Sequence, residues 1–81
     1  MVIVDYDPDF QRIFNRLDKS IKTKVEKVLV KIIENPKIGK PMRYSRKGTR
    51  EVYVSPFRIS YAYIPSKNKI IILNLYHKDE Q

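Results

Sequence analysis

The clearest pattern of apolar and polar positions lies between Arg50 and Lys78, where three runs are rich in valine, isoleucine, tyrosine and phenylalanine. Such residues fit a pleated, half-buried surface. Two short breaks separate the runs, one at Ser55-Pro56 and one at Pro65-Ser66-Lys67-Asn68. Because short breaks of this kind join antiparallel neighbours, the pattern predicts a three-stranded antiparallel meander.

The middle run alternates with a period of two, so its side chains divide between the two faces of the sheet. The apolar set, which we assign to a face covered by helices, consists of Phe57, Ile59, Tyr61 and Tyr63, with Val52, Val54, Ile71, Leu73 and Leu75 from the neighbouring runs. Arg58 points to the opposite, open face. The same alternation brings four more side chains to that face, namely Glu51, Tyr53, Tyr76 and Lys78.

His77 is not assigned to the same face as Arg58. Strict alternation puts it on the helix side, where a lone histidine is more often a structural group than a reactive one. It stands near the end of its strand, however, and a bulge would move it to the other face. The periodicity alone leaves both positions open.

The chain upstream predicts elements that cover one face of this sheet. Val2 to Tyr6 is apolar and β-branched, which indicates a short strand, and Asp7-Pro8 suits the start of the helix that follows. Apolar residues from Phe10 to Leu17 recur at helical spacing. A second helical stripe begins near Ser20, a good N-cap residue, and ends before Pro36.

Two amphipathic helices joined by two or three residues form a hairpin that can lie across a sheet. We therefore predict an α+β fold, with two N-terminal helices packed on one face of an antiparallel sheet in the order β-α-α-β-β-β. The 81 residues are enough for one domain, which spans 1–81.

Charge adds a possible partner to this picture. The chain has 17 Lys and Arg against nine Asp and Glu, a net charge of +8. Residues 36–78 hold ten basic residues and only one acidic residue, Glu51. So basic a surface attracts polyanions, nucleic acid above all, although such charge can also serve only to keep a small protein in solution.

The segment 36–50 is the most basic part of the chain. It contains both glycines and two of the five prolines, so we predict a loop in which Met42 to Ser45 form a short strand. Its six basic residues and lack of acidic ones favour contact with RNA phosphates over a merely solvated loop. The predicted RNA-binding residues are Arg43, Tyr44, Arg46, Lys47 and Arg50.

Several classes of site are excluded. One histidine and no cysteine rule out ordinary zinc sites, and the scarcity of carboxylates near the sheet rules out a two-metal nuclease. There is no glycine-rich phosphate loop. The longest apolar run, Ile70 to Leu73, is too short for a membrane span, and the N-terminus lacks a signal peptide. We predict a cytoplasmic protein with no cofactor, no metal, no membrane contact and no small-molecule ligand.

RNA cleavage is compatible with these exclusions, because the ribose 2′-hydroxyl is a built-in nucleophile. The protein must position the strand in line, move two protons and stabilise the extra charge at phosphorus. Arg58 is the candidate for the charge, since its fork of donors matches phosphate oxygens.

The order of these features resembles the RelE/ParE superfamily of toxin–antitoxin toxins, and the similarity covers nearly the whole chain. A strand, two helices and a Gly-Lys-Pro loop precede the meander. The most specific motif is an aromatic-Arg-aliphatic-x-Tyr strand, here Phe57-Arg58-Ile59-Ser60-Tyr61, and the closing pair His77-Lys78 follows at the usual distance.

The resemblance implies a small ribonuclease that cleaves mRNA in the ribosomal A site. Arg58 matches the family arginine assigned to the scissile phosphate, while His77 and Lys78 match positions that different branches use in catalysis. Glu51 and Tyr53 are catalytic candidates because alternation places them beside Arg58 on the open face, although many members of the family carry basic residues at these two positions. Asp79-Glu80-Gln81 stands where many active members place a tyrosine.

The resemblance also implies a partner, an antitoxin of the RelB-like kind that holds the toxin inactive. The basic stretch 36–78 and the uncovered sheet face predict that this partner is acidic and partly disordered when free. Two other functions stay open at this point. Relatives of ParE inhibit DNA gyrase, and a non-catalytic RNA- or ribosome-binding module would carry the same charge.

Overall fold

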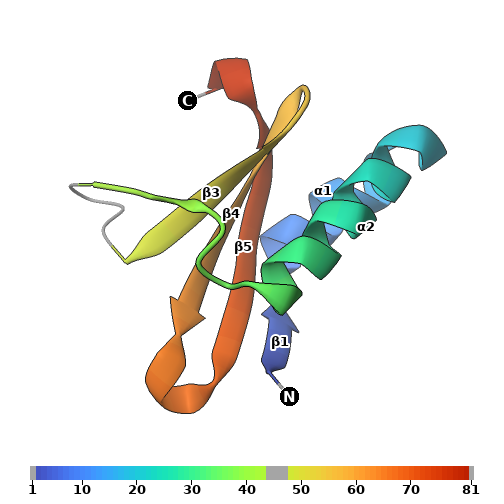
Figure 1. Ribbon diagram of the computed structural model, residues 1–81. Helices are drawn as coiled ribbons and strands as arrows, with labels where there is room; N and C mark the ends of the chain where they lie inside the picture. The colour runs from blue at the N-terminus through green and yellow to red at the C-terminus, as the bar shows by residue number, and fades with distance from the viewer. Residues whose placement is uncertain (1, 44–47, 81) are drawn as a thin grey trace.

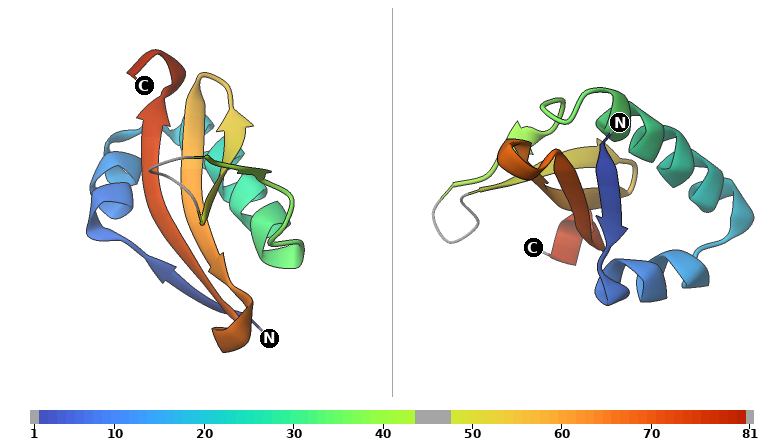
Figure 2. Two further views of the ribbon diagram at one scale, coloured as in Figure 1. Left: turned by 90° about the vertical axis from the view of Figure 1, so that its left-hand side faces the viewer. Right: turned by 90° about the horizontal axis from the view of Figure 1, so that it is seen from below.

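A computed structural model of the chain describes residues 2–43 and 48–80, and it places two helices on one side of a five-stranded sheet (Figures 1 and 2). The elements are β1 Ile3–Tyr6, α1 Pro8–Arg16, α2 Lys19–Glu34, β2 Lys40–Pro41, β3 Thr49–Val54, β4 Phe57–Ile64 and β5 Lys69–His77, with short 3-10 turns at Pro65–Lys67 and Lys78–Glu80. The predicted α+β architecture and element order are confirmed.

Local side-chain caps explain where the helices begin. Asp7 accepts a hydrogen bond from the backbone N–H of Asp9 at 2.8 Å, as expected, and Pro8 opens α1. The cap of α2 is Asp18, not Ser20 as the sequence indicated. Its carboxylate accepts from the Ile21 N–H at 3.0 Å and from the Ser20 hydroxyl at 2.9 Å, and these bonds, that from Ile21 above all, lower the pKa of Asp18.

The strands follow one another in the sheet in the order β1-β5-β4-β3-β2. The pairs β3–β4 and β4–β5 are antiparallel, so the predicted meander is present. β1 is the edge strand opposite β2. It runs parallel to its neighbour β5, which makes the sheet mixed rather than wholly antiparallel. Parallel pairing is possible because a long connection, which includes the helix hairpin, separates β1 from β5 in the chain.

A β-bulge in β5 changes part of the predicted face assignment. Ser60 pairs with Asn74 and Tyr61 pairs with Ile72, so Leu73 has no direct partner on β4. The extra residue shifts the alternation by one position. Leu75 lies in the core as predicted, but Ile71 pairs with Ala62 on the open face, so its assignment to the helix side was wrong, and Leu73 is the extra residue at the bulge.

The core lies between the sheet and the helices, mainly α2. Its fully buried side chains come from both layers, and they are Val25, Ile32, Ile59, Tyr61, Ile70, Ile72 and Leu75. Phe10 of α1 packs against the same cluster. With both helices on this side, the opposite face of the sheet is left open.

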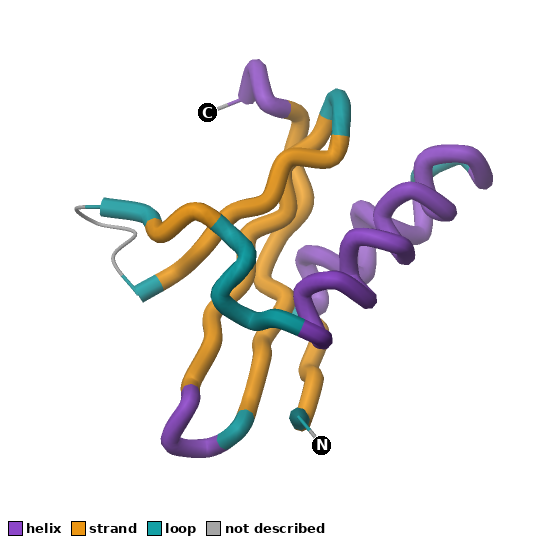
Figure 3. The backbone as a smooth tube through the Cα atoms, in the orientation of Figure 1, coloured by secondary structure: helices purple, strands orange, loops and turns teal. Residues whose placement is uncertain are grey.

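The path from α2 back to the sheet also differs from the prediction. The chain leaves Glu34 and crosses to β2 before it reaches β3 (Figure 3). We predicted a short strand from Met42 to Ser45, whereas the paired residues are Lys40 and Pro41, and Met42 adds one further bond from its N–H to the carbonyl of Thr49 at 3.0 Å. Tyr44 and Ser45 lie outside the described residues.

Two further properties concern the described residues only. None of their helices has the length and apolar character needed to cross a membrane. They contain no group of three or more His, Cys, Asp or Glu side chains that could hold a metal ion.

Candidate functional site

One end of the open face carries a row of polar side chains from three neighbouring strands. Tyr53 on β3 pairs with Arg58 on β4, and Arg58 pairs with Tyr76 on β5. Paired residues point to the same face of a sheet. Glu51 lies two residues from Tyr53 on the same strand, and Lys78 follows the end of β5. The five side chains that alternation assigned to the open face therefore lie close together.

Glu51 is the buried member of this group. It is 5% exposed, and within residues 2–43 and 48–79 no other charged residue is buried. Tyr76 donates its phenolic hydrogen to Glu51 Oε2, and Glu51 Oε1 lies 3.8 Å from Nη1 of Arg58. A buried carboxylate needs such partners because the loss of hydration would otherwise be costly.

Arg58 is the exposed counterpart of Glu51. Its side chain is 36% exposed, so it is partly accessible to solvent. Its Nε is buried and has no hydrogen-bond acceptor among the described residues. Buried donors are normally paired, so this unused N–H is a group that a bound anion could satisfy.

Tyr53 stands between two cations. Half of its surface is exposed, the Arg58 guanidinium carbon lies 5.8 Å from the ring centroid, and Lys78 Nζ lies 5.9 Å from it. Each distance is at the outer limit of a cation–π contact. The same ring therefore lies near both cations of the open face.

His77 lies away from this group, on the other face. It pairs with Phe57, and the two rings meet edge to face with centroids 5.8 Å apart. Phe57 packs against the core. The imidazole Nδ1 accepts from the backbone N–H of Asp79 at 3.3 Å and is 3.6 Å from the Asp79 carboxylate. The structure therefore does not bring His77 to Arg58.

The predicted RNA-binding residues also divide. Arg43 is exposed at the end of the described part of the basic loop, and Tyr44, Arg46 and Lys47 lie outside the described residues. Arg50 faces the helix side, because it pairs with Tyr61. Its guanidinium donates to the carbonyls of Lys37 at 3.2 Å and Gly39 at 2.8 Å. In the structure Arg50 is thus engaged with the protein backbone.

Tyr61 makes the second connection to this loop, and sequence reasoning treated it only as a core residue. Its hydroxyl accepts from the Gly39 N–H at 2.9 Å and donates to the carbonyl of Pro36 at 2.8 Å. Burial raises the pKa of Tyr61 above its usual value, although the bond from Gly39 and the charge of Arg50 oppose the shift. A Cβ at position 39 would stand 2.6 Å from that hydroxyl, which leaves room only for glycine.

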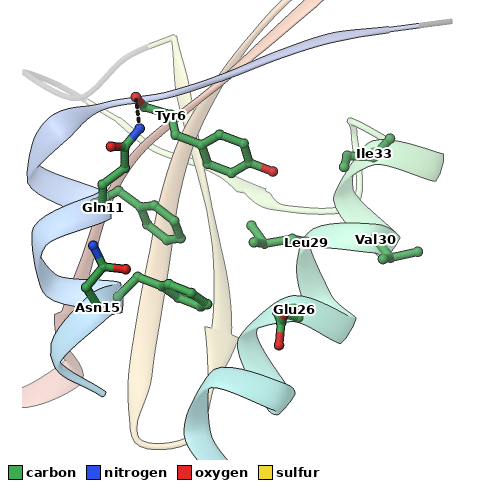
Figure 4. Close-up of a pocket in the computed structure, with 9 residues that line it drawn as sticks. Tyr6, Gln11, Asn15, Glu26, Leu29, Val30 and Ile33 are labelled. Carbon is green, nitrogen blue, oxygen red and sulfur yellow. Dashed lines mark hydrogen bonds between the residues drawn. The ribbon is translucent and has the colours of Figure 1, made fainter. Parts of the chain in front are cut away.

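A separate groove of about 500 Å³ lies between the two helices, away from Arg58 (Figure 4). The lining is mainly apolar, with polar groups at the rim, and it comprises Tyr6, Phe10, Gln11, Phe14, Asn15, Glu26, Leu29, Val30 and Ile33. Gln11 donates to the carbonyl of Tyr6 at 3.2 Å at its edge. The sequence did not reveal this groove, because its apolar residues have the same helical spacing as core residues.

Comparison with known proteins identifies the family. Residues 4–81 match the family model described as ParE toxin of type II toxin–antitoxin system, parDE. The chain belongs to this family. It is therefore a toxin of the RelE/ParE group of type II toxin–antitoxin systems, as the resemblance indicated. Among curated protein sequences, none matches it.

Solved structures of the group share the fold of this toxin. The intact E. coli RelBE toxin–antitoxin complex matches with a TM-score of 0.82 and 18% identity, over 95% of this chain and 96% of that one. The RelBE2 complex from Mycobacterium tuberculosis matches at 0.84 and 22%, over 95% and 98%. The YoeB/ParE toxin from Agrobacterium tumefaciens matches at 0.83 and 12%, over 94% and 98%. At such identities the likeness concerns the fold.

Proposed function

We propose that this toxin is a ribosome-dependent, metal-independent endoribonuclease that cleaves mRNA by attack of the ribose 2′-hydroxyl. One observation carries the proposal. Arg58, with an unused donor and a partly exposed side chain, is held on the open face between Glu51, Tyr53 and Tyr76, with the Lys78 ammonium near the Tyr53 ring. This arrangement suits an anion whose charge increases during the reaction.

In the proposed reaction the 2′-oxygen forms a bond to phosphorus and the bond from phosphorus to the 5′-oxygen breaks. The products are a 2′,3′-cyclic phosphate and a 5′-hydroxyl. Arg58 stabilises the additional negative charge on the phosphoryl oxygens, and the Lys78 ammonium gives a proton to the departing 5′-oxygen. The proton of the 2′-hydroxyl passes to solvent.

The other side chains on the open face position the cations of Arg58 and Lys78. Glu51 and Tyr76 hold Arg58, because the carboxylate lies against the guanidinium and is itself fixed by the phenol. Tyr53 lies near both Arg58 and Lys78, and in the proposed reaction the two cations contact different oxygens of the substrate. Catalysis then consists mainly of positioning and charge stabilisation, and ribosome-bound mRNA supplies the extended strand.

Inhibition of DNA gyrase is the second candidate, favoured by the ParE description of the matching family model. One experiment separates the candidates. The purified protein is added to a translating extract and to an extract without ribosomes, and mRNA ends are mapped, with a gyrase supercoiling assay beside it. We expect new 5′ ends only where ribosomes are present, and unaffected supercoiling.

Two other results would overturn the ribonuclease proposal. Blocked supercoiling with intact mRNA would identify a gyrase inhibitor. Binding to ribosomes with neither effect would identify a non-catalytic module.

The proposed partner is an acidic, RelB-like antitoxin. Several of the matching structures are complexes of a toxin with its antitoxin, among them RelBE from E. coli and RelBE2 from Mycobacterium tuberculosis. Here, an acidic segment that folded over the open face would neutralise Arg58 and Lys78. Co-expression with the neighbouring gene product tests this, and we expect a complex that raises the yield and loses affinity with salt. Harmless high-level expression of the chain alone, with no acidic peptide bound, would contradict it.

A further inference from the structure

Lys40 lies on the same face as the proposed site, although the sequence placed it only in a basic loop. It forms half of the two-residue strand β2 and pairs directly with Glu51. Since paired residues share a face, the Lys40 side chain leaves the sheet next to the buried carboxylate, and Lys40 itself is exposed. No ion pair of its ammonium is found among the described residues.

The position of Lys40 relative to Arg58 follows from the sheet. Two strand spacings and two residues separate them, which corresponds to roughly 12 Å between Cα atoms. Both side chains are long and can lean toward each other. Lys40 therefore stands beside the proposed site, at a distance suited to the next phosphate of an RNA strand and not to the phosphate at Arg58.

The loop before Lys40 is held in place by hydrogen bonds from side chains on the helix side of the sheet. The side chains of Tyr61 and Arg50 bond the backbone of residues 36–39. We call these two side chains and that backbone segment the loop anchor. Four hydrogen bonds form it, two at the Tyr61 hydroxyl and two at the Arg50 guanidinium. Gly39 precedes Lys40 directly, and its N–H and carbonyl are both bonded in the anchor.

We propose that Lys40 is a further RNA-binding residue of the site, contacting the phosphate next to the scissile one, and that the loop anchor positions it. The proposal rests on the ribonuclease function proposed above. A flexible lysine loses conformational freedom when it binds, and a backbone that is already fixed reduces the entropy to be lost. The anchor lies on the helix side of the sheet, so it acts on RNA only through β2.

The first test compares Lys40→Met with Lys24→Met, a control that removes an exposed lysine from α2. Both are assayed on ribosome-bound mRNA. We expect Lys40→Met to raise KM about tenfold, as for loss of one bond to a charged group, with kcat nearly unchanged. Its salt slope should fall by about 0.7. Lys24→Met should change neither. An unchanged KM for Lys40→Met, or an equal effect of Lys24→Met, would overturn the proposal.

The second test is a double-mutant cycle of Lys40→Met with Tyr61→Phe, which removes the hydroxyl of the anchor. Tyr61→Phe should raise KM in the presence of Lys40 and have little further effect in its absence, while its effect on Tm stays the same in both. Additive effects on KM would show that Tyr61 does not act through Lys40. If Tyr61→Phe does not fold, Arg50→Ala replaces it in the cycle.

Arg58→Ala and the unaltered protein are included in both tests. Cleavage that depends on Arg58 but not on Lys40 contradicts this inference alone. Absence of cleavage by the unaltered protein contradicts the proposed function, and this inference with it.

Discussion

Tyr76 donates its phenolic hydrogen to Glu51, a carboxylate that is 5% exposed although it lies on the face of the sheet that no helix covers. The guanidinium of Arg58 lies 3.8 Å from the same carboxylate. The three side chains come from three adjacent strands, so the sheet itself fixes their spacing. Arg58 is therefore held in place before any substrate binds, which is the condition for effective charge stabilisation.

Glu51→Gln tests whether Glu51 positions Arg58 or accepts a proton. The amide oxygen can still accept from Tyr76, so we expect less than a tenfold fall in kcat and an unchanged pH profile. Single-turnover cleavage between pH 5 and 9 measures both. A fall of about 10²–10⁴-fold, with loss of the acidic limb of the profile, would instead show that Glu51 is a general base.

His77→Ala should affect stability and not chemistry, because His77 packs against Phe57 on the helix side. Loss of the edge-to-face contact should lower the free energy of unfolding by about 1 kcal/mol, which for a domain of this size lowers Tm by roughly 4–8 °C. Thermal unfolding and single-turnover cleavage are measured together. An unchanged Tm with a loss of about 10²-fold or more in rate would make His77 an acid or base.

The sequence predicted the open-face group well because β4 alternates strictly and β3 pairs with it in register. The β5 side of the sheet was less predictable. The bulge at Leu73 arises from the pairing of two strands, and no residue in that run marks it. Similarly, Asp18 and Ser20 are both good cap residues, and only the fold shows that Asp18 is used while Ser20 bonds to it.

The loop anchor was hidden for a different reason. Tyr61 fits the apolar alternation of β4, so its hydroxyl gives no separate signal, and its partners are backbone groups at Pro36 and Gly39. Alternation with Glu51 already puts Arg50 on the helix side, but its charge favoured contact with RNA, and only the structure shows its bonds to the carbonyls of Lys37 and Gly39. Contacts between distant segments are the part of this site that periodicity could not supply.

Tyr61→Phe should lower stability at neutral pH by about 1–3 kcal/mol, because the buried N–H of Gly39 loses its acceptor. The raised pKa of Tyr61 adds a pH dependence. The unfolded phenol ionises above about pH 10, so the contribution of Tyr61 is complete below that pH and is lost as pH rises through its raised folded pKa. Urea unfolding at pH 8 and pH 11 should show a smaller difference between the two proteins at pH 11. A constant difference would contradict the assignment.

Binding to ribosomes should weaken steeply with salt, and the basic loop should account for part of that slope. Arg43→Ala should reduce the slope by about 0.7, and Arg46→Ala and Lys47→Ala in the adjoining segment should each do the same. Lys24→Ala, on an exposed position of α2, is the matched control and should leave the slope unchanged. A triple variant with an unaltered slope would place the contact with RNA elsewhere.

The most direct test of the account is single-turnover cleavage of ribosome-bound mRNA by Arg58→Ala, beside Arg12→Ala, which removes an exposed arginine from α1. Thermal unfolding confirms that both variants fold. We predict that Arg58→Ala loses about 10²–10³-fold in rate, as expected when one donor to the developing charge is removed, and that Arg12→Ala cleaves normally. Cleavage at the full rate by folded Arg58→Ala would contradict the ribonuclease account.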